Sequence, residues 1–401
     1  NYPKKVDIRG YKPTYRGHSL QIKKAAEAIS QAKKPVICAG GGIINANATP
    51  ELLTLAEKCR IPVATTLMGI GSIPYNHELN MGMLGSHGVY AANYAVSNAD
   101  LVLILGARVA DRAVGKDARV LKTARIIHID IDPAEIGKNI DVAIPIVGDI
   151  KQVLTQLLKV VTPGDVEEWN STLSKVKKEK GIKLPEAGIQ EGERAKLTMQ
   201  NDKAQDGRSP DGILLTDKKQ WVNPKYLMSI LADKAGENAV ITTEVGQNQI
   251  WAANYFKVRK PRTFISSGGM GTMGYGLPAA VGAKIGSANS KVICIAGDGS
   301  FQMSMQELGT IKQNRLGVKI IILNNRRLGM VRELQKQKYC GRYSEVFLDE
   351  NPDFVKIAGA YGFAGERITT NAEIEGALER MFENDLPYLL ECVVDPEEST
   401  L

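Results

Sequence analysis

Two apolar runs joined by a helical pattern place polar residues at the ends of neighbouring strands. The run 291–296 is typical of a buried parallel strand and stops at Gly297-Asp298-Gly299. Apolar residues then recur at helical spacing from 301 to 313, and a second apolar run over 318–323 ends at Asn324-Asn325. Because ligands bind at the carboxyl ends of strands in open α/β sheets, this βαβ unit predicts a binding site.

The residues at that edge indicate which ligand it binds. Asp298 offers a carboxylate oxygen and Asn325 an amide oxygen, and Mg²⁺ prefers such ligands, with phosphate and water completing its shell. Gly297 and Gly299 let a backbone approach an anion, and the start of the next helix directs amides toward it. A Gly-Asp-Gly sequence alone is typical of a simple tight turn. The Asn-Asn pair after 24 further residues favours a magnesium–diphosphate site instead.

The first part of the chain alternates strands with helices, which predicts a doubly wound parallel sheet. Between them, 67–88 is expected to be rich in loops. A dense run of basic residues over 175–180 is interpreted as a solvated helix face. Helices are expected over 18–32, 49–59 and 89–98, and strands over 35–39, 61–66, 100–105, 125–130 and 142–147.

Each of these strands ends in residues that could bind a nucleotide. Gly40-Gly41-Gly42 alone is typical of a turn, but glycines after a strand also allow a dinucleotide to come close. Thr66, Gly106 with Arg108, and Asp130 with Asp132 follow the next strands, and an acidic residue there can bind ribose hydroxyls. Together these strand ends predict a nucleotide site.

The remainder of the chain predicts a linker and a second sheet of the same kind. Asn223-Pro224 is a helix start, followed by a strand over 239–243 with a polar end at 244–249. Five glycines between 268 and 276 indicate a backbone pressed against a ligand or another chain. A helix from 351 and a strand over 388–394 complete this part. The expected units are a linker over 1–17, a domain over 18–165, a linker over 166–221 and a domain over 222–401.

Composition restricts the class of protein. A chain of 401 residues with 43% hydrophobic and 24% charged residues suits two α/β domains. No apolar run approaches the roughly 18 residues of a membrane span, and the start of the chain has no signal-peptide pattern. The five cysteines are widely spaced, which favours reduced thiols of a cytoplasmic protein. The net charge of +7 comes from scattered residues, so no nucleic-acid partner is expected.

Gly297-Asp298-Gly299 followed by Asn324-Asn325 resembles the thiamine-diphosphate motif of decarboxylases and carboligases. The segment 267–280, Ser-Gly-Gly-Met-Gly-Thr-Met-Gly-Tyr-Gly-Leu-Pro-Ala-Ala, narrows the resemblance to the acetolactate synthase large subunit. It covers nearly the whole chain, most weakly between about 165 and 220. It implies condensation of two pyruvates, or pyruvate and 2-oxobutyrate, to an acetohydroxyacid with loss of CO₂. It also implies thiamine diphosphate, Mg²⁺ and a structural FAD.

The resemblance assigns roles to individual positions. Met273 would be the apolar support under the bent cofactor, although a Met in such a loop could be ordinary packing. Arg112 would meet the carboxylate of the second 2-oxoacid at the site entrance, or pair with Asp111. His87 is assigned to the flavin, whereas His128 is interpreted as structural. The metal ligands would be Asp298, Asn325 and the backbone carbonyl of Arg327. The thiamine-diphosphate positions would be Val245, Gly246, Gln247, Asn248, Gly271, Met273, Gly297, Gly299, Ser300, Gly329 and Met330. The FAD positions would be Gly40, Gly41, Gly42, Thr66, Leu67, Gly85, Ser86, His87, Gly106, Arg108, Arg112, Asp130, Ile131 and Asp149.

The sequence departs from the family pattern in three respects. The family's N-terminal pyrimidine-binding domain, which carries the glutamate that activates the cofactor, has no counterpart here, so the chain alone is expected to be inactive. Leu334 stands where the family places a tryptophan that shapes the acceptor pocket, which leaves the preference for 2-oxobutyrate open. Ser86 replaces a common Met.

Several partners and rival functions follow from the resemblance. A homo-oligomer is expected, because the family binds its cofactor between subunits, and a regulatory small subunit is possible. One rival is another thiamine-diphosphate reaction on 2-oxoacids, such as that of pyruvate oxidase or glyoxylate carboligase, or of an oxalyl-CoA-type decarboxylase. The other rival is a cofactor-binding half of a split enzyme.

Overall fold

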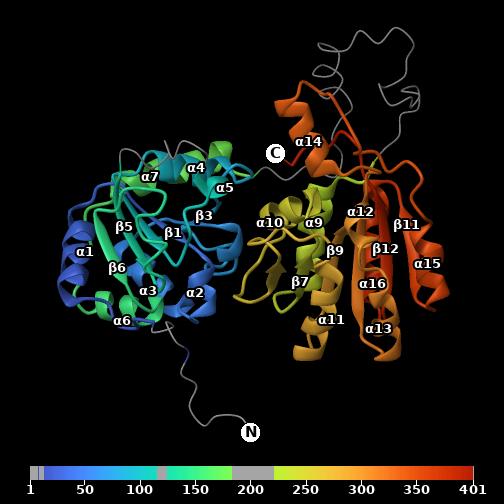
Figure 1. Cartoon of the computed structure of the whole chain (residues 1–401), viewed down its shortest axis with the longest axis horizontal. Coiled ribbons are helices and arrows are strands. Elements are labelled where there is room, and N and C mark those ends of the chain that lie inside the picture. The colour runs from blue at the N-terminus through green and yellow to red at the C-terminus, as the bar shows by residue number, and fades with distance from the viewer. Residues whose placement is uncertain (1–7, 9–12, 115–123, 183–220, 401) are drawn as a thin grey trace.

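The computed structural model describes residues 8, 13–114, 124–182 and 221–400, which form two α/β units side by side (Figure 1). Each unit contains one six-stranded sheet, and every strand pairing within the two sheets is parallel. The predicted fold class, two doubly wound parallel sheets, is confirmed. Parts of the two expected linkers, namely 1–7 and 9–12 of the first and 183–220 of the second, lie outside the described residues.

The first sheet has the strand order β3-β2-β1-β4-β5-β6. Helices α1, α3 and α6 pack on one face, and α4 and α7 pack on the other. The strands are β1 (Pro35–Ala39), β2 (Val63–Thr65), β3 (Asn80–Met83), β4 (Leu101–Leu105), β5 (Arg125–Asp130) and β6 (Ile144–Val147). The helices are α1 (Ser19–Gln31), α2 (Gly41–Asn45), α3 (Thr49–Cys59), η1 (Leu67–Gly69), α4 (Tyr90–Ser97), α5 (Asp111–Val114), α6 (Ile150–Leu158) and α7 (Glu167–Lys180).

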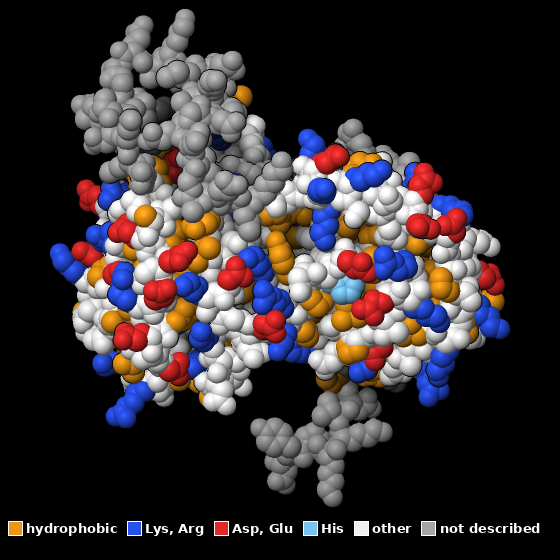
Figure 2. Space-filling view, turned by 180° about the vertical axis from the view of Figure 1, so that it is seen from behind, with side chains coloured by type: hydrophobic (Ala, Val, Ile, Leu, Met, Phe, Trp, Pro, Cys, Tyr) orange, Lys and Arg blue, Asp and Glu red, His pale blue; other side chains and the backbone are white. Residues whose placement is uncertain are grey.

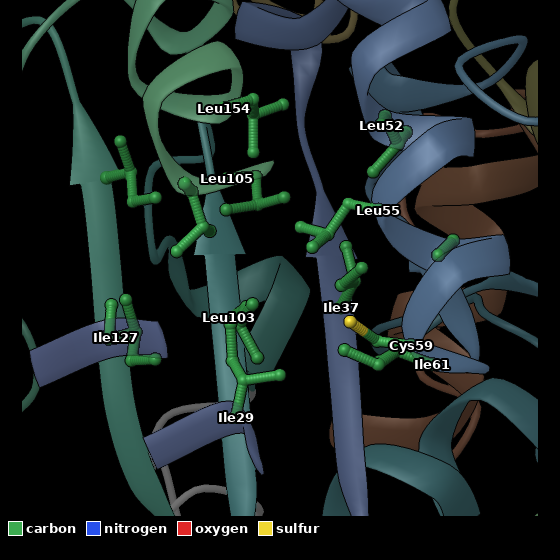
Figure 3. Close-up of a cluster of buried hydrophobic side chains, with 14 of the residues drawn as sticks. Ile29, Ile37, Leu52, Leu55, Cys59, Ile61, Leu103, Leu105, Ile127 and Leu154 are labelled. Atoms are coloured by element: carbon green, nitrogen blue, oxygen red, sulfur yellow. The ribbon is translucent and has the colours of Figure 1, made fainter. Parts of the chain in front are cut away.

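Strand β1 explains why this sheet reads as continuous apolar runs. All five of its residues are buried, and alternate side chains point to opposite faces. Ile37 therefore joins the core under α1, α3 and α6, whereas Val36 joins the core under α4 and α7. Figure 3 shows the first of these cores, with Ile127, Leu103 and Ile37 on three neighbouring strands and Leu55 of α3 next to Ile37. A strand covered on both faces needs apolar residues at every position.

The second sheet has the strand order β11-β12-β10-β9-β7-β8. Its first helix begins as predicted, because the side chain of Asn223 accepts hydrogen bonds from the amides of Lys225 and Tyr226. The strands are β7 (Val240–Thr243), β8 (Phe264–Ser266), β9 (Val292–Gly297), β10 (Val318–Asn324), β11 (Ala364–Ile368) and β12 (Tyr388–Val393). The helices are α9 (Pro224–Ala235), α10 (Gln247–Tyr255), α11 (Gly276–Gly286), α12 (Asp298–Phe301), α13 (Glu307–Gln313), α14 (Gly329–Lys338), α15 (Phe354–Ala360), η3 (Asn371–Glu373) and α16 (Ile374–Phe382).

The structure differs from the sequence-based expectation in the first unit. Strand β3 lies in the stretch 67–88 that was expected to be loops, and it contains Gly82 with a positive φ of 91°. Helix α7 begins at Glu167, inside the range 166–221 expected to be a linker. Its Trp169 is 4% exposed and donates a hydrogen bond of 3.2 Å to the carbonyl of Pro35. The packed part of the first unit therefore extends beyond residue 165.

A second difference lies in the helix expected over 301–313. The structure has two short helices, α12 and α13, with turns between them. In the turns, the amides of Met303 and Ser304 donate to carbonyls three residues earlier, at 3.2 Å each. Such i to i+3 bonds wind the chain more tightly than an α-helix, so the two helices do not continue into each other.

Backbone and side-chain hydrogen bonds join the two units. The amide of Tyr75 donates to the carbonyl of Val258 at 2.9 Å. The guanidinium of Arg262 donates to the carbonyl of Ile44 at 2.9 Å and to the side chain of Asn47 at 3.0 Å. These contacts connect residues 258–262, just before β8, to the end of α2 and to the stretch before β3.

The surface carries charges of both signs (Figure 2), and most of the cysteines are buried. Figure 2 shows acidic and basic side chains interspersed over one face of the molecule. Among the described residues, no helix is both long enough and apolar enough to cross a membrane. All five cysteines are free, and only Cys340 is exposed. Burial raises the pKa of the Cys38 thiol to about 12, which makes it unreactive at neutral pH.

Candidate functional site

The order in which the chain adds strands to the second sheet reverses between β7 and β9. These two parallel strands pair along Val240–Thr243. The chain leaves β7 toward β8 on one side, whereas β9 and β10 lie on the other. A switch point of this kind opens a crevice at the carboxyl ends of the strands. Glu244 to Gly246 follow β7 and Asp298 follows β9, so both predicted segments lie at this crevice.

Asp298 is buried at this edge, with 1% of its surface exposed. Its carboxylate accepts a hydrogen bond of 2.6 Å from the amide of Asn351. Burial raises the pKa of Asp298 to about 6, while the bond from Asn351 and the backbone amides of Gly299 and Arg326 act in the opposite direction. The carboxylate therefore lies beside the turn that follows β10, where Asn325 is located.

Asn325 and Gln247 connect the turn after β10 to the turn after β7. The side-chain amide of Asn325 donates to Gln247 Oε1 at 2.9 Å. Gln247 Nε2 donates to Glu333 of α14 at 3.1 Å and to the carbonyl of Glu398 at 3.0 Å. The structure thus brings together the predicted segments after β7, β9 and β10, which are far apart in the sequence.

The donor set at this edge fits a magnesium ion shared with a diphosphate. Among the described residues, no group of three or more His, Cys, Asp and Glu side chains could hold a metal. One buried carboxylate and a nearby carboxamide leave most of an octahedral shell to phosphate and water, as Mg²⁺ prefers. The guanidinium of Arg327 is bound elsewhere, to Asp349 at 2.7 Å and over the ring of Phe347 at 4.5 Å. Only the backbone of Arg327 is therefore offered to a metal.

The glycine-rich segment 268–276 is anchored by Glu244, a residue for which the sequence analysis predicted no role. Glu244 is 0% exposed, and its carboxylate accepts hydrogen bonds from four backbone amides at the end of this segment and the start of α11. Burial raises the pKa of Glu244, and the four amides lower it. The contact joins residues about 30 positions apart, so no local sequence pattern predicts it. Met273, the predicted cofactor support, is half-buried in this segment.

The first sheet has its own switch point, between β1 and β4, in a strand order shared with dinucleotide-binding folds. The triple glycine after β1 meets Gly106 after β4, where the amide of Gly42 donates to the Gly106 carbonyl at 2.9 Å. A Cβ atom on Gly40 or Gly42 would overlap the backbone of Gly106. The need for glycine at these two positions is therefore explained by packing between two turns. Thr66 is adjacent, because its amide donates to the carbonyl of Ala39 at 2.9 Å.

The loop 84–88 lies against the segment that carries the two predicted arginines. The amide of Ser86 donates to the carbonyl of Arg112 at 2.9 Å, and a Cβ atom on Gly85 would overlap that carbonyl. Arg108 and Arg112 are exposed. His87 Nδ1 is buried and has no hydrogen-bond partner within the described part of the chain. Burial lowers the pKa of His87, so a neutral imidazole is available to bind another group.

The remaining first-unit positions lie at the ends of β5 and β6. Ile131 is 41% exposed, and Asp130 accepts a hydrogen bond of 3.0 Å from the amide of Asp132. Asp149 accepts from the amide of Gln152 at 3.0 Å and so caps the start of α6. The side chain of Asp149 thus has a structural role at this edge. The N-cap pattern of Asp149 is a signal that the sequence analysis did not use.

Comparison with known proteins matches both units of the structure to domain families. Residues 22–157 match the thiamine pyrophosphate enzyme central domain. Residues 244–392 match the C-terminal TPP binding domain of the thiamine pyrophosphate enzymes. The chain belongs to the thiamine pyrophosphate enzyme family.

Three similar proteins are named as acetolactate synthases or their large subunits. The chain is 45% identical to a probable acetolactate synthase large subunit from Methanocaldococcus jannaschii, over 99% of this chain and 64% of that protein. It is 40% identical to an acetolactate synthase large subunit from Buchnera aphidicola, over 97% of this chain and 64% of that protein. It is 39% identical to an acetolactate synthase from Mycobacterium bovis, over 98% of this chain and 61% of that protein. The chain therefore spans less than two thirds of the length of these relatives, and the predicted resemblance is confirmed.

Two family departures can be located in the structure. Leu334 is half-buried on α14, the helix that also carries Glu333. Figure 1 shows α14 at the top of the second unit with the C-terminus beside it. Ser86 is exposed in the loop that contacts Arg112. Ser86 therefore lies beside Arg112, whereas Leu334 follows Glu333, whose carboxylate accepts the hydrogen bond from Gln247.

Proposed function

We propose that this chain binds magnesium thiamine diphosphate and forms part of a carboligase that joins two 2-oxoacids with release of CO₂. The proposed reaction is formation of 2-acetolactate from two pyruvates, or of the homologous product from pyruvate and 2-oxobutyrate, in branched-chain amino acid synthesis. The observation that carries the proposal is the position of Asp298, Asn325 and Gln247 after β9, β10 and β7 at the switch point of the second sheet, where Asn325 is bonded to Gln247. The names of the relatives support this choice of reaction.

In this proposal, the segments after β7, β9 and β10 hold the diphosphate and its metal. Asp298, the side chain of Asn325 and the backbone carbonyl of Arg327 would bind Mg²⁺. The segments 245–248, 297–300 and 329–330 would surround the diphosphate. Thiamine diphosphate, when bound, supplies the electron sink that makes loss of CO₂ from a 2-oxoacid possible.

Other residues of the chain would orient the cofactor and the second substrate. Met273, in the segment anchored by Glu244, would support the thiamine from one side, and Gly271 would let the backbone approach it. Arg112 is exposed and planar, so its guanidinium can form two parallel bonds with the carboxylate of a 2-oxoacid. Leu334 and Ser86 are smaller than the tryptophan and the methionine that the family commonly has at these positions. They would therefore leave a wider pocket for the second 2-oxoacid.

FAD is proposed at the switch point of the first sheet. The strand order, the exposed Arg108 and Ile131 and the unpaired Nδ1 of His87 support this placement. Gly40 and Gly42 pack closely on Gly106, so they would hold the turns after β1 and β4 together beneath the flavin site. The proposed partners are further copies of the chain and a pyrimidine-binding domain, together with a regulatory small subunit suggested by the relatives' names.

The test is formation of acetolactate from pyruvate with thiamine diphosphate, Mg²⁺ and FAD. The chain is assayed alone and with the N-terminal domain of a relative supplied separately. Activity only after that domain is added supports the proposal. Cofactor binding without acetolactate in either case contradicts the proposed reaction while leaving the cofactor site intact. Release of CO₂ without carbon–carbon bond formation favours a different 2-oxoacid reaction.

A further inference from the structure

We infer that Glu244 is a positioning residue that fixes the glycine-rich segment 268–276, with Met273, against the end of β7. The inference rests on the proposed function, because it concerns how the thiamine part of the cofactor is supported. It goes beyond that function by assigning a role to a buried carboxylate that itself touches neither metal nor diphosphate in the proposed arrangement.

Each of the two carboxylate oxygens of Glu244 accepts two hydrogen bonds from backbone amides. Oε2 accepts from the amides of Gly274 at 2.7 Å and Tyr275 at 3.1 Å. Oε1 accepts from the amides of Gly276 at 2.7 Å and Leu277 at 3.2 Å. Helix α11 begins at Gly276, and the first amides of a helix have no partner within it. A capping side chain usually comes from the residue just before the helix, whereas here it comes from the end of a strand in the sheet.

The backbone is held at the same place from a second direction. Thr242 Oγ1 donates to the carbonyl of Gly276 at 2.8 Å. A Cβ atom on Gly276 would lie 2.7 Å from the amide nitrogen of Glu244, so glycine is needed for the close approach. Gly274 has a positive φ of 81°, which glycine adopts without strain. Strand β7 therefore determines where the segment that carries Met273 ends.

The hydrogen bonds in the outer part of the segment are local. The amide of Gly271 donates to the carbonyl of Ser267 at 2.7 Å, and the amide of Thr272 donates to Ser267 Oγ at 3.1 Å. Met270 is 89% exposed, and no atom lies within 4 Å of the Cβ position of Gly271. Since these bonds are local, the hydrogen bonds to Glu244 are the attachment to the sheet that directly follows Met273, while Gly268 lies against Leu67 and Met68.

The chemistry of this anchor requires a carboxylate. Four amides need four lone pairs, which the two oxygens of an ionised carboxylate supply. In Glu244→Gln, one oxygen becomes an NH₂ group that faces N–H donors, so two amides lose their acceptor. Glu244→Asp keeps both oxygens on a side chain shorter by one methylene, so part of the anchor is retained.

The diphosphate side of the site has separate support. Asn248 Nδ2 donates to the carbonyls of Glu244 and Ile295, at 3.1 Å and 3.0 Å, and these bonds do not use the Glu244 side chain. Gln247 is held by Asn325. Loss of the carboxylate should therefore displace the support of the thiamine rings more than the diphosphate cradle. A general loss of stability would weaken both.

The experiment measures binding of two probes to the full chain by calorimetry in the presence of Mg²⁺. Thiamine diphosphate reports on the whole site, and inorganic pyrophosphate reports on the cradle alone. The control is Glu373→Gln, because Glu373 also accepts from two loop amides, those of Thr369 and Thr370, at the far edge of the same sheet. Melting temperatures of all variants are recorded in parallel.

We expect Glu244→Gln to weaken thiamine diphosphate binding about tenfold or more, and pyrophosphate binding by less than about threefold. Glu244→Asp should recover part of the loss, and Glu373→Gln should change neither affinity. Equal losses for the two probes, or no loss for either, would overturn the inference. If Glu244→Gln does not fold, the same comparison is made with Glu244→Asp, where a selective loss supports the inference and parallel losses overturn it. A wild-type chain that binds pyrophosphate but not thiamine diphosphate would overturn the proposed function, and the inference with it.

Discussion

Gly329, the first residue of α14, tests the packing between the turns after β7 and β10. A Cβ atom there would overlap the carboxamide of Gln247 and would lie 2.9 Å from Asn325 Nδ2. Gln247 would have to leave its position, together with its hydrogen bonds to Asn325, Glu333 and the carbonyl of Glu398. A neutral bond contributes about 0.5–1.5 kcal/mol to stability, and a bond to a charged group contributes more.

Gly329→Ala should therefore lower the free energy of unfolding by about 2–4 kcal/mol. This estimate allows for partial rearrangement of Gln247 and for about 0.5–1 kcal/mol gained by removing glycine from a helix. Urea denaturation followed by circular dichroism measures the change. The matched control is Gly282→Ala in α11, since no atom lies within 4 Å of that Cβ position and the residue is exposed. The control should gain about 0.5–1 kcal/mol. If Gly329→Ala is neutral or stabilising like the control, the described position of Gln247 is wrong.

Three further predictions concern other parts of the chain. Burial lowers the pKa of Lys319 from its ordinary 10.5 to about 8, so the folded state binds this proton more weakly than the unfolded state. Stability should thus rise by up to about 3 kcal/mol between pH 8 and 10.5, and Lys319→Met should remove this rise in urea titrations compared across pH. Asn351→Ala should weaken Mg²⁺ binding in the presence of thiamine diphosphate about tenfold, measured by calorimetry, because Asp298 loses the bond that orients it; an unchanged affinity would mean that Asn351 does not orient the ligand. Trp169→Ala should lower the free energy of unfolding, measured by urea denaturation, by about 3–5 kcal/mol, and Trp169→Phe should lower it by about 1 kcal/mol. Equal losses for the two variants would contradict the packing of α7 on the first sheet.

Much of the fold could be predicted because the long parallel strands are covered on both faces. Strands such as β4 and β10 consist of buried residues along their whole length, so their apolar runs and boundaries can be read directly. Strands β3 and β8 are only four and three residues long, and Gly82 in β3 has a backbone conformation that is not extended. Their pairing depends on neighbouring strands, which a single local window does not contain.

The location of the candidate site could be predicted where the chemistry resides in the motif itself. The sequence singles out Asp298 and Asn325 because polar residues at the ends of buried strands stand out against their surroundings, and their roles as metal ligands stay a prediction. Asn351 and Glu244 were missed, because each acts through a partner about 30 to 50 positions away. The predicted role of Gly40 at the flavin stays a prediction, and the structure adds a second reason for glycine there. The neighbour of Gly40 is the backbone of Gly106, and a sequence cannot distinguish close packing against protein from close approach of a ligand.

The most direct test of the account is the Mg²⁺ dependence of thiamine diphosphate binding to the full chain, with and without Asp298. Calorimetry is performed on wild type, on Asp298→Ala and on the remote control Glu373→Gln, each with Mg²⁺ and with chelator. We predict that wild type and control bind the cofactor only when Mg²⁺ is present. Asp298→Ala should lose about a hundredfold or more in affinity, because it removes the charged ligand of the metal. If Asp298→Ala keeps undiminished Mg²⁺-dependent binding, the metal site has been placed wrongly and the central claim fails.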